Sequence, residues 1–258
     1  MKIISIANFK GGVGKTTTAI NLAAGLKLRK QKVLLIDIDP QANLTQSLGL
    51  TDEIETSIYS VLRKEAFGEN TKLLNARLQV QNLDLIPAAL ELASAELELS
   101  SVYGREQILA QLLKKVKNYD FVLIDCPPSM GMLTINALAA SDYVLIPLQA
   151  EFLPLKGVKS FLKHFRSIQR LNKELELLGF VLTKYDARKN MNQQVKAQLE
   201  KEFPKGQVFK TLIRTNIALA KAQEAGTDIF TFDKRSHGSL DYAELTREFL
   251  SKIKSKNK

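Results

Sequence analysis

The chain has 258 residues, of which 45% are hydrophobic and 25% charged, and its formal net charge is +10. This is the composition of an ordinary globular protein, and no apolar run approaches the ~20 residues of a membrane span. A single cysteine, Cys126, excludes an intrachain disulfide and suits a reducing compartment. The length fits one large domain, which we place at residues 1–250, followed by a basic, flexible tail at 251–258.

The first predicted strand is the apolar run Ile3 to Ala7, and a helical pattern covers Thr18 to Arg29. A glycine-rich turn joins them, and strand, glycine turn and helix form the context of a phosphate-binding loop. The backbone N–H groups close around a phosphate without Cβ clashes, and the helix N-terminus faces the same anion. Lys15 reaches the β- and γ-phosphates, and the Thr16 hydroxyl ligates Mg²⁺. The predicted nucleotide-binding residues of this loop are Lys10, Gly11, Gly12, Val13, Gly14, Lys15, Thr16 and Thr17.

Two carboxylates follow the second predicted strand, Val33 to Ile36, in the string Asp-Ile-Asp-Pro-Gln that begins at Asp37. Residues two apart on a strand end point the same way. Beside a magnesium phosphate site, Asp37 and Asp39 are suited to hold metal-bound water and to orient an attacking water.

Further along the chain, the runs Leu83 to Ile86 and Phe121 to Ile124 predict two more buried strands. The second is followed at once by Asp125, which is the Walker B arrangement of an apolar strand and then an aspartate that reaches Mg²⁺ through water. The predicted metal residues are thus Thr16, Asp37 and Asp125. Cys126 is expected to be a small buried residue rather than a nucleophile.

The remaining predicted strands are Tyr143 to Ile146, Leu178 to Leu182 and Val208 to Ile213. Helical patterns lie between the strands, at Arg105 to Lys117, Leu155 to Leu171 and Asn192 to Phe203. Alternating strands and helices predict an α/β fold, a mostly parallel twisted sheet with helices on both faces, of the P-loop NTPase type. Ligands of such sheets bind at the carboxyl ends of the strands, where each polar motif lies.

Positive charge is concentrated in the second half of the chain. Residues 1–129 carry 15 Lys and Arg against 14 Asp and Glu, whereas residues 130–258 carry 22 against 13. Within the predicted helix 155–171 and just beyond it, basic residues recur every three or four positions on one face, opposite an apolar face. This face is either a solvated helix surface or a DNA contact. Its residues are Lys156, Lys159, Lys163, Arg166, Arg170 and Lys173.

The loop string Lys-Gly-Gly-Val-Gly-Lys-Thr-Thr, the Asp-x-Asp-Pro-Gln string and the Walker B string together resemble the ParA/MinD ATPases, which have a deviant Walker A loop. The resemblance runs from Met1 to about Phe249. It implies that Lys10 is the signature lysine, which reaches the phosphates held by the other subunit of a nucleotide-sandwich dimer. It also implies that Asp39 orients the hydrolytic water and that Asp37 lies near the Mg²⁺. The catalytic residues would then be Lys10, Lys15 and Asp39.

The C-terminal motifs are similar to those of the same family. Thr183 starts a string that occupies the place of a guanine specifier but contains no Asn-Lys-x-Asp, which favours adenine. Asn216 matches the family position beside adenine and ribose, whereas Arg214 and Thr215 stand where the family usually has Pro and Arg. Family members bind DNA with an arginine in the region of Arg188. Together with the helical face, the predicted DNA-binding residues are Lys156, Lys159, Lys163, Arg166, Arg170, Arg188, Lys189 and Arg214.

The resemblance implies a ParA/Soj-type partition ATPase with ATP and Mg²⁺ as cofactors. It would be a homodimer on ATP, bind double-stranded DNA without sequence preference, and hydrolyse ATP slowly until a ParB-like partner stimulates it. We expect it in the cytoplasm on the nucleoid, with no membrane partner. Two alternatives stay open: a MinD-like membrane-associated regulator of division, and a ParA-like positioner of protein cargo.

Overall fold

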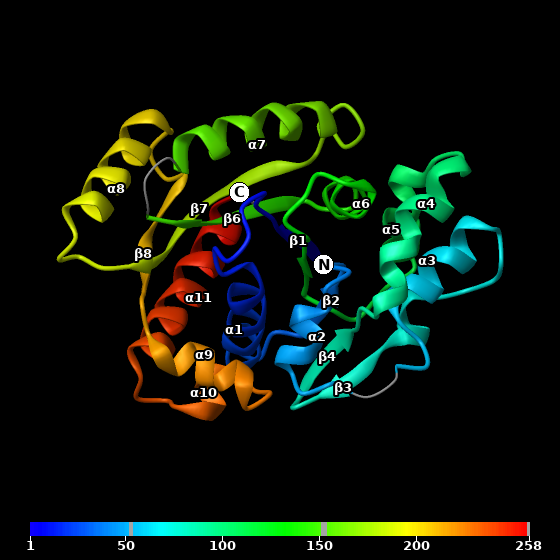
Figure 1. Cartoon of the computed structure of the whole chain (residues 1–258), viewed down its shortest axis with the longest axis horizontal. Helices are drawn as coiled ribbons and strands as arrows, with labels where there is room; N and C mark the ends of the chain where they lie inside the picture. Colours follow the sequence, from blue (N-terminus) through cyan, green and yellow to red (C-terminus); the bar gives the residue numbers. More distant parts are fainter. Residues whose placement is uncertain (52–53, 151–153, 257–258) are drawn as a thin grey trace.

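The structure is a computed structural model that describes residues 1–51, 54–150 and 154–256, except for the side chains of 154–156. It contains one eight-stranded sheet (Figure 1). The strands are β1 Lys2–Ile6, β2 Val33–Asp37, β3 Leu78–Val80, β4 Leu83–Ile86, β5 Phe121–Asp125, β6 Tyr143–Gln149, β7 Glu176–Tyr185 and β8 Val208–Arg214. The α-helices are α1 Lys15–Leu28, α2 Asn43–Ser47, α3 Ile58–Ala66, α4 Ala95–Glu98, α5 Ile108–Lys114, α6 Met132–Ala139, α7 Pro154–Ile168, α8 Asn190–Glu202, α9 Ile217–Glu224, α10 Ile229–Phe232 and α11 His237–Lys256.

The strand order across the sheet is β3-β4-β2-β5-β1-β6-β7-β8. All neighbours are parallel except β3 and β4, which form an antiparallel pair at one edge. In β1, β2 and β5, parallel registration aligns Ile6 with Asp125 and Asp37 with Asp125. The carboxyl ends of these three strands therefore meet at one place.

Strand residues alternate between two hydrophobic cores, one on each face of the sheet. In β2, Leu34 and Ile36 belong to the core covered by α3, α5, α6, α7 and α8. Val33 and Leu35 belong to the other core, which α1, α2, α9, α10 and α11 cover. Because both faces are covered, the central strands read as continuous apolar runs instead of alternating with polar residues.

All seven strands predicted from the sequence are present, and the predicted α/β fold with helices on both faces is confirmed. Strand β3 was not predicted, because Leu78 and Gln79 are exposed at the edge of the sheet and give no buried apolar run. The four predicted helices correspond to α1, α5, α7 and α8. Among the described residues, no helix combines the length and the apolar character that crossing a membrane requires.

Residues 251–256, which the sequence analysis places in a basic tail, continue α11 in the structure. The apolar face of this helix runs on at four-residue spacing from Leu245 through Phe249 to Ile253, and all three side chains are buried. Lys252 also places its ammonium 4.4 Å from the ring centre of Phe209. Packing of this face onto the sheet therefore holds the last turns of the helix; residues 257–258 lie outside the described part.

Helix α11 also binds the backbone of the edge strand β8. The Glu248 carboxylate accepts hydrogen bonds from the backbone N–H groups of Lys210 and Thr211, both at 2.9 Å. About two turns earlier in the same helix, the Asp241 carboxylate accepts a hydrogen bond from the backbone N–H of Arg214 at 2.9 Å. These carboxylates occupy donors that would otherwise be open to another strand.

Candidate active site

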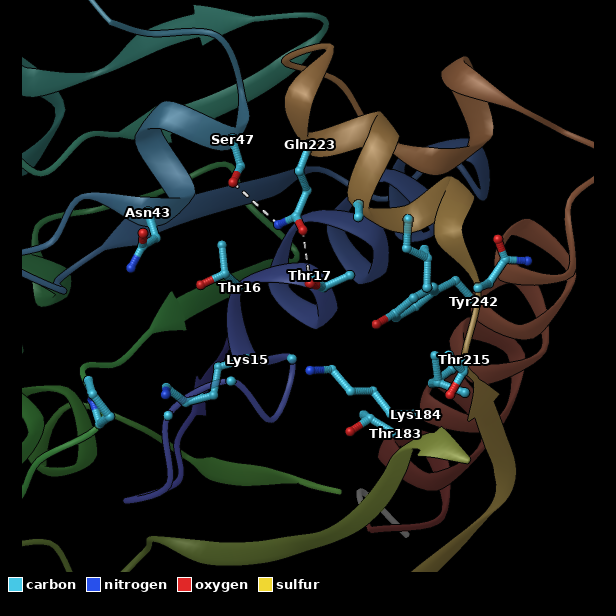
Figure 2. Close-up of a pocket in the computed structure, with 18 of the residues that line it drawn as sticks. Lys15, Thr16, Thr17, Asn43, Ser47, Thr183, Lys184, Thr215, Gln223 and Tyr242 are labelled. Atoms are coloured by element: carbon cyan, nitrogen blue, oxygen red, sulfur yellow. Dashed lines mark hydrogen bonds between the residues drawn. The ribbon is translucent and has the colours of Figure 1, made fainter. Parts of the chain in front are cut away.

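A cavity of about 540 Å³ opens at the carboxyl ends of the central strands (Figure 2). Its lining comes from distant parts of the chain: the glycine-rich loop, the segment after β2, the ends of β7 and β8, and α9. The predicted residues along it are Gly11, Gly12, Gly14, Lys15, Thr16, Thr17, Asp39, Arg214 and Asn216. Val13 is buried behind the loop. The sequence motifs are therefore brought together around one site.

The glycine-rich loop is held by hydrogen bonds to two neighbouring strands, β7 and β6. Thr183, near the end of β7, donates its hydroxyl to the Val13 carbonyl over 2.7 Å. The Asn8 amide donates to the Pro147 carbonyl over 2.7 Å, and its oxygen accepts from the Lys10 N–H. Gly14 precedes α1 with φ +85°, which favours glycine. A Cβ at Gly11 or Gly12 would have no described atom within 4 Å, so the space over the loop is open for a phosphate.

Lys15 and Thr16 begin α1 and lie beside the end of β5. The Thr16 hydroxyl donates to Asp125 Oδ2 over 2.6 Å. Asp125 Oδ1 is buried and has no hydrogen-bond partner among the described residues. Burial, followed by the neighbouring charge of Asp37, raises the pKa of Asp125 well above its usual value. An orphaned carboxylate oxygen next to a hydroxyl is a donor set that fits Mg²⁺ or a water bound to it.

The two carboxylates after β2 have different environments. Asp37 accepts hydrogen bonds from the Asp39 N–H at 3.1 Å, and from the Thr45 N–H and hydroxyl at 2.9 and 2.7 Å. Burial raises its pKa to about 6 in spite of these bonds. Asp37 thus lies next to Asp125 but fixes the loop that leads into α2. Asp39 is also buried and accepts from the Gln41 N–H at 3.0 Å, at the lining of the cavity.

The far side of the cavity, around the ends of β8 and α9, is where the sequence places the base. Asn216 caps α9, because its side-chain oxygen accepts from the Ala218 N–H at 2.8 Å. Arg214 is bound to Asp241 through both Nε and Nη2, the latter at 2.6 Å. Its guanidinium is therefore engaged within the chain, a pairing that no local sequence pattern predicts.

Several lining residues escaped the sequence analysis as site residues: Gln41, Thr183, Lys184, Gln223 and Tyr242. Thr183 and Lys184 fall in the string that occupies the place of a guanine specifier. Tyr242 comes from α11 and contacts the Thr18 hydroxyl at 3.2 Å. No local motif marks it or Gln223, because their neighbours at the site lie some 200 residues away.

The predicted DNA-binding residues fall into two groups. The first group lies on α7 and just past its end, where the exposed residues are Lys159, Lys163, Arg166 and Arg170. Lys159 pairs with Glu202 of α8 at 3.3 Å. The side chain of Lys156 lies outside the described part. Arg188, Lys189 and Arg214 instead line a hollow of about 640 Å³ at the ends of β7 and β8.

Arg188 is exposed but already paired. Its guanidinium binds Asp186 through Nε at 3.0 Å and Nη2 at 2.9 Å. These bonds, with a further one from the Arg188 N–H, lower the pKa of Asp186 to about 2. Lys10, the predicted trans-acting lysine, is exposed at the start of the glycine-rich loop.

Comparison with known proteins assigns residues 1–177 to a family described as "AAA domain". The chain is 45% identical over 250 residues to the sporulation initiation inhibitor protein Soj of Bacillus subtilis, a match that covers 96% of this chain and 97% of that one. It is 40% identical to the chromosome-partitioning ATPase Soj of Treponema pallidum, over 97% of this chain and 98% of the other.

Two solved structures share the fold over nearly the whole chain. Cobyrinic acid a,c-diamide synthase from Mycobacterium smegmatis, with bound ADP and magnesium, is 34% identical with a TM-score of 0.85, covering 99% of this chain and 96% of that chain. A putative plasmid partition protein from Borrelia burgdorferi, bound to AMPPNP, is 29% identical with a TM-score of 0.80, and the match covers 99% of each chain. Nucleotide with or without magnesium is thus present in neighbours of this fold.

Proposed function

The chain belongs to the Soj/ParA family of partition ATPases, and we propose that ATP pairs two copies of it into a dimer that binds duplex DNA without sequence preference. Hydrolysis, slow in the protein alone and stimulated by a ParB-like partner, then separates the dimer and releases the DNA. The cargo is a chromosome or plasmid, and the protein acts in the cytoplasm on the nucleoid.

The observation that carries this proposal is that Lys15, Thr16 and Asp39 line one cavity, with Asp125 hydrogen-bonded to Thr16 directly behind it. Lys15 binds the β- and γ-phosphates as a fixed cation. Thr16 and Asp125 would hold Mg²⁺, which neutralises phosphate charge when bound. Asp39, buried beside the loop, orients a water for attack on the γ-phosphate.

In the proposed dimer, Lys10 acts on the nucleotide of the partner subunit. It is exposed at the mouth of the loop, whereas Lys15 is buried within it. Two lysines in these positions suit two different phosphate sites: Lys15 serves its own subunit, and Lys10 serves the nucleotide of the partner. A cation supplied in trans stabilises the charge that develops at the γ-phosphate, as an arginine finger does.

The DNA face consists of the exposed cations of α7 together with Arg188 and Lys189. Each lysine or arginine that neutralises a phosphate releases counterions, so affinity rises with the number of contacts. One subunit offers few such contacts, and a dimer doubles them. This doubling makes DNA binding depend on ATP. Both Arg188 and Arg214 are paired with an aspartate, but the Arg214 side chain is only 45% exposed against 90% for Arg188, so Arg214 is the weaker candidate for this face.

The proposal is tested by measuring molecular mass in solution with Mg²⁺ and ATP, alongside phosphate release. Asp39→Ala should bind ATP, form a stable dimer and release no phosphate, because it loses water orientation but no phosphate contact. Lys10→Ala should stay monomeric, and Lys15→Ala should not bind ATP. An Asp39→Ala protein whose mass is the same with and without ATP would show that the sandwich dimer is wrong.

A further inference from the structure

Gln223 of α9 lies between the first turn of α1 and the end of α2 at the side of the nucleotide cavity (Figure 2). Its Oε1 accepts from the Thr17 hydroxyl at 3.3 Å, and its Nε2 donates to the Ser47 hydroxyl at 3.3 Å. A carboxamide carries an acceptor and a donor at the end of one side chain. A single residue therefore connects the phosphate-binding helix with the helix that follows Asp39.

The ends of α2 and α9 also touch through their backbones. A Cβ on Gly226, just after α9, would lie 2.9 Å from the Cα of Gly49, just after α2. Both glycines have positive φ, +65° and +85°, so neither position favours a side chain. The Gln81 amide also donates to the Gly226 carbonyl. With backbones this close, a shift of one helix end displaces the other.

The position of α2 determines where Asp39 lies. Only residues 40–42 separate Asp39 from the start of α2 at Asn43. Thr45 of this helix is held by Asp37, and its hydroxyl accepts from the Ala88 N–H at 3.0 Å. The helix is thus anchored to β2 at one end, while Gln223 holds Ser47, its last residue, against α1.

We propose that Gln223 is a positioning residue for ATP hydrolysis. It fixes the position of α2, and therefore of Asp39, relative to the first turn of α1. This inference rests on the proposed function of the site. Removing the two hydrogen bonds of Gln223 leaves the phosphate loop intact but lets the end of α2 move. A displacement of ~1 Å at a catalytic group costs on the order of 100-fold in rate, so a smaller displacement of Asp39 should lower turnover by about 10-fold.

The test uses Gln223→Met, which keeps the length of the side chain and removes both hydrogen bonds. We expect the kcat of basal hydrolysis to fall by about 10-fold, while the Kd of a fluorescent ATP analogue changes by less than about 2-fold. Ser47→Ala should lower kcat in the same way. Combining the two substitutions should lower it little further, because both remove the same contact. Glu224→Ala, at an exposed neighbouring position on α9, is the matched control and should keep the wild-type kcat.

The proposal is overturned if Gln223→Met turns over ATP at the wild-type rate, or if the kcat losses of the two single variants multiply in the double variant. It is also overturned if Gln223→Met weakens binding of the ATP analogue as much as it lowers kcat, since Gln223 would then act on the nucleotide itself. A wild-type protein that hydrolyses no ATP would instead refute the proposed function, so the two failures are distinguishable.

Discussion

At the scale of single residues, Asp125 combines two features that rarely occur together. Its carboxylate is buried, which raises its pKa, and one of its oxygens has no hydrogen-bond partner among the described residues. Leaving a buried polar atom unsatisfied costs about 1–3 kcal/mol, and a bound cation or its water would remove that cost. A cation bound here, as proposed, would therefore stabilise the folded protein.

Asp125→Asn is expected to weaken magnesium-dependent nucleotide binding by about 10–100-fold, the range for loss of a group that supports a metal. Titration of a fluorescent ATP analogue with Mg²⁺ and with EDTA measures this. The wild-type protein should lose affinity in EDTA, and Asp125→Asn should be nearly insensitive to the chelator. Equal sensitivity of the two proteins to EDTA would show that Asp125 does not support the metal.

The residues of the site that the sequence predicted are those within contiguous strings. Lys15, Thr16, Asp39 and Asp125 each follow an apolar strand run, so the local pattern alone places them at one edge of a parallel sheet. Gln223 contributes through a contact to Thr17, 206 positions away in the chain. No local pattern encodes such a contact, because it depends on how α9 packs against α1 and α2.

At the scale of elements, the close contact between α1 and α11 explains a glycine in the middle of a helix. A Cβ on Gly25 would lie 2.2 Å from the Thr246 hydroxyl oxygen and 3.2 Å from its Cβ. Thr246 has little freedom to move away, because it is fully buried and its hydroxyl donates to the Tyr242 carbonyl at 2.7 Å. The glycine therefore allows the two helices to approach each other.

Gly25→Ala should destabilise the protein by about 1–3 kcal/mol, the usual cost of overpacking a core, despite the better helix propensity of alanine. Denaturant unfolding measures this change. Gly157→Ala in α7 is the matched control: a Cβ there has no described atom within 4 Å. It should stabilise the protein by roughly 0.5–1 kcal/mol. If both substitutions shift stability in the same direction, the contact of α1 with α11 is not the reason for Gly25.

The sequence predicts helices and strands where a single pattern, either a continuous apolar run or a helical repeat, extends over the whole element. The central strands are continuous apolar runs because both faces of the sheet are covered, and they were found to within three residues at each end. Strand β3 and the last turns of α11 were missed. The first is exposed, and the second is basic in composition yet held by Phe249 and Ile253, so composition alone suggested a tail.

At the scale of the whole molecule, the cations proposed for the DNA face lie outside the lining of the nucleotide cavity, although the neighbouring hollow shares Arg214 and Thr215 with that lining. Lys163, Arg166 and Arg170 extend along α7 and its flank, and Arg188 with Lys189 lines a hollow at the ends of β7 and β8. In the proposed function, pairing of two subunits on ATP links the nucleotide site to these cations. These five cations on each subunit make about ten per dimer, so log affinity should fall against log salt with a slope of about −9.

ATP is expected to turn this basic protein into a DNA-binding dimer. The most direct measurement is binding to a duplex of arbitrary sequence with ATP, with ADP and without nucleotide, beside anionic lipid vesicles under the same conditions. Binding should occur with ATP alone, be indifferent to sequence, fall steeply with salt and weaken in Lys163→Glu with Arg166→Glu, whose basal hydrolysis stays near wild type. DNA binding that is the same with and without nucleotide, or an ATP-dependent preference for the vesicles, would contradict the account.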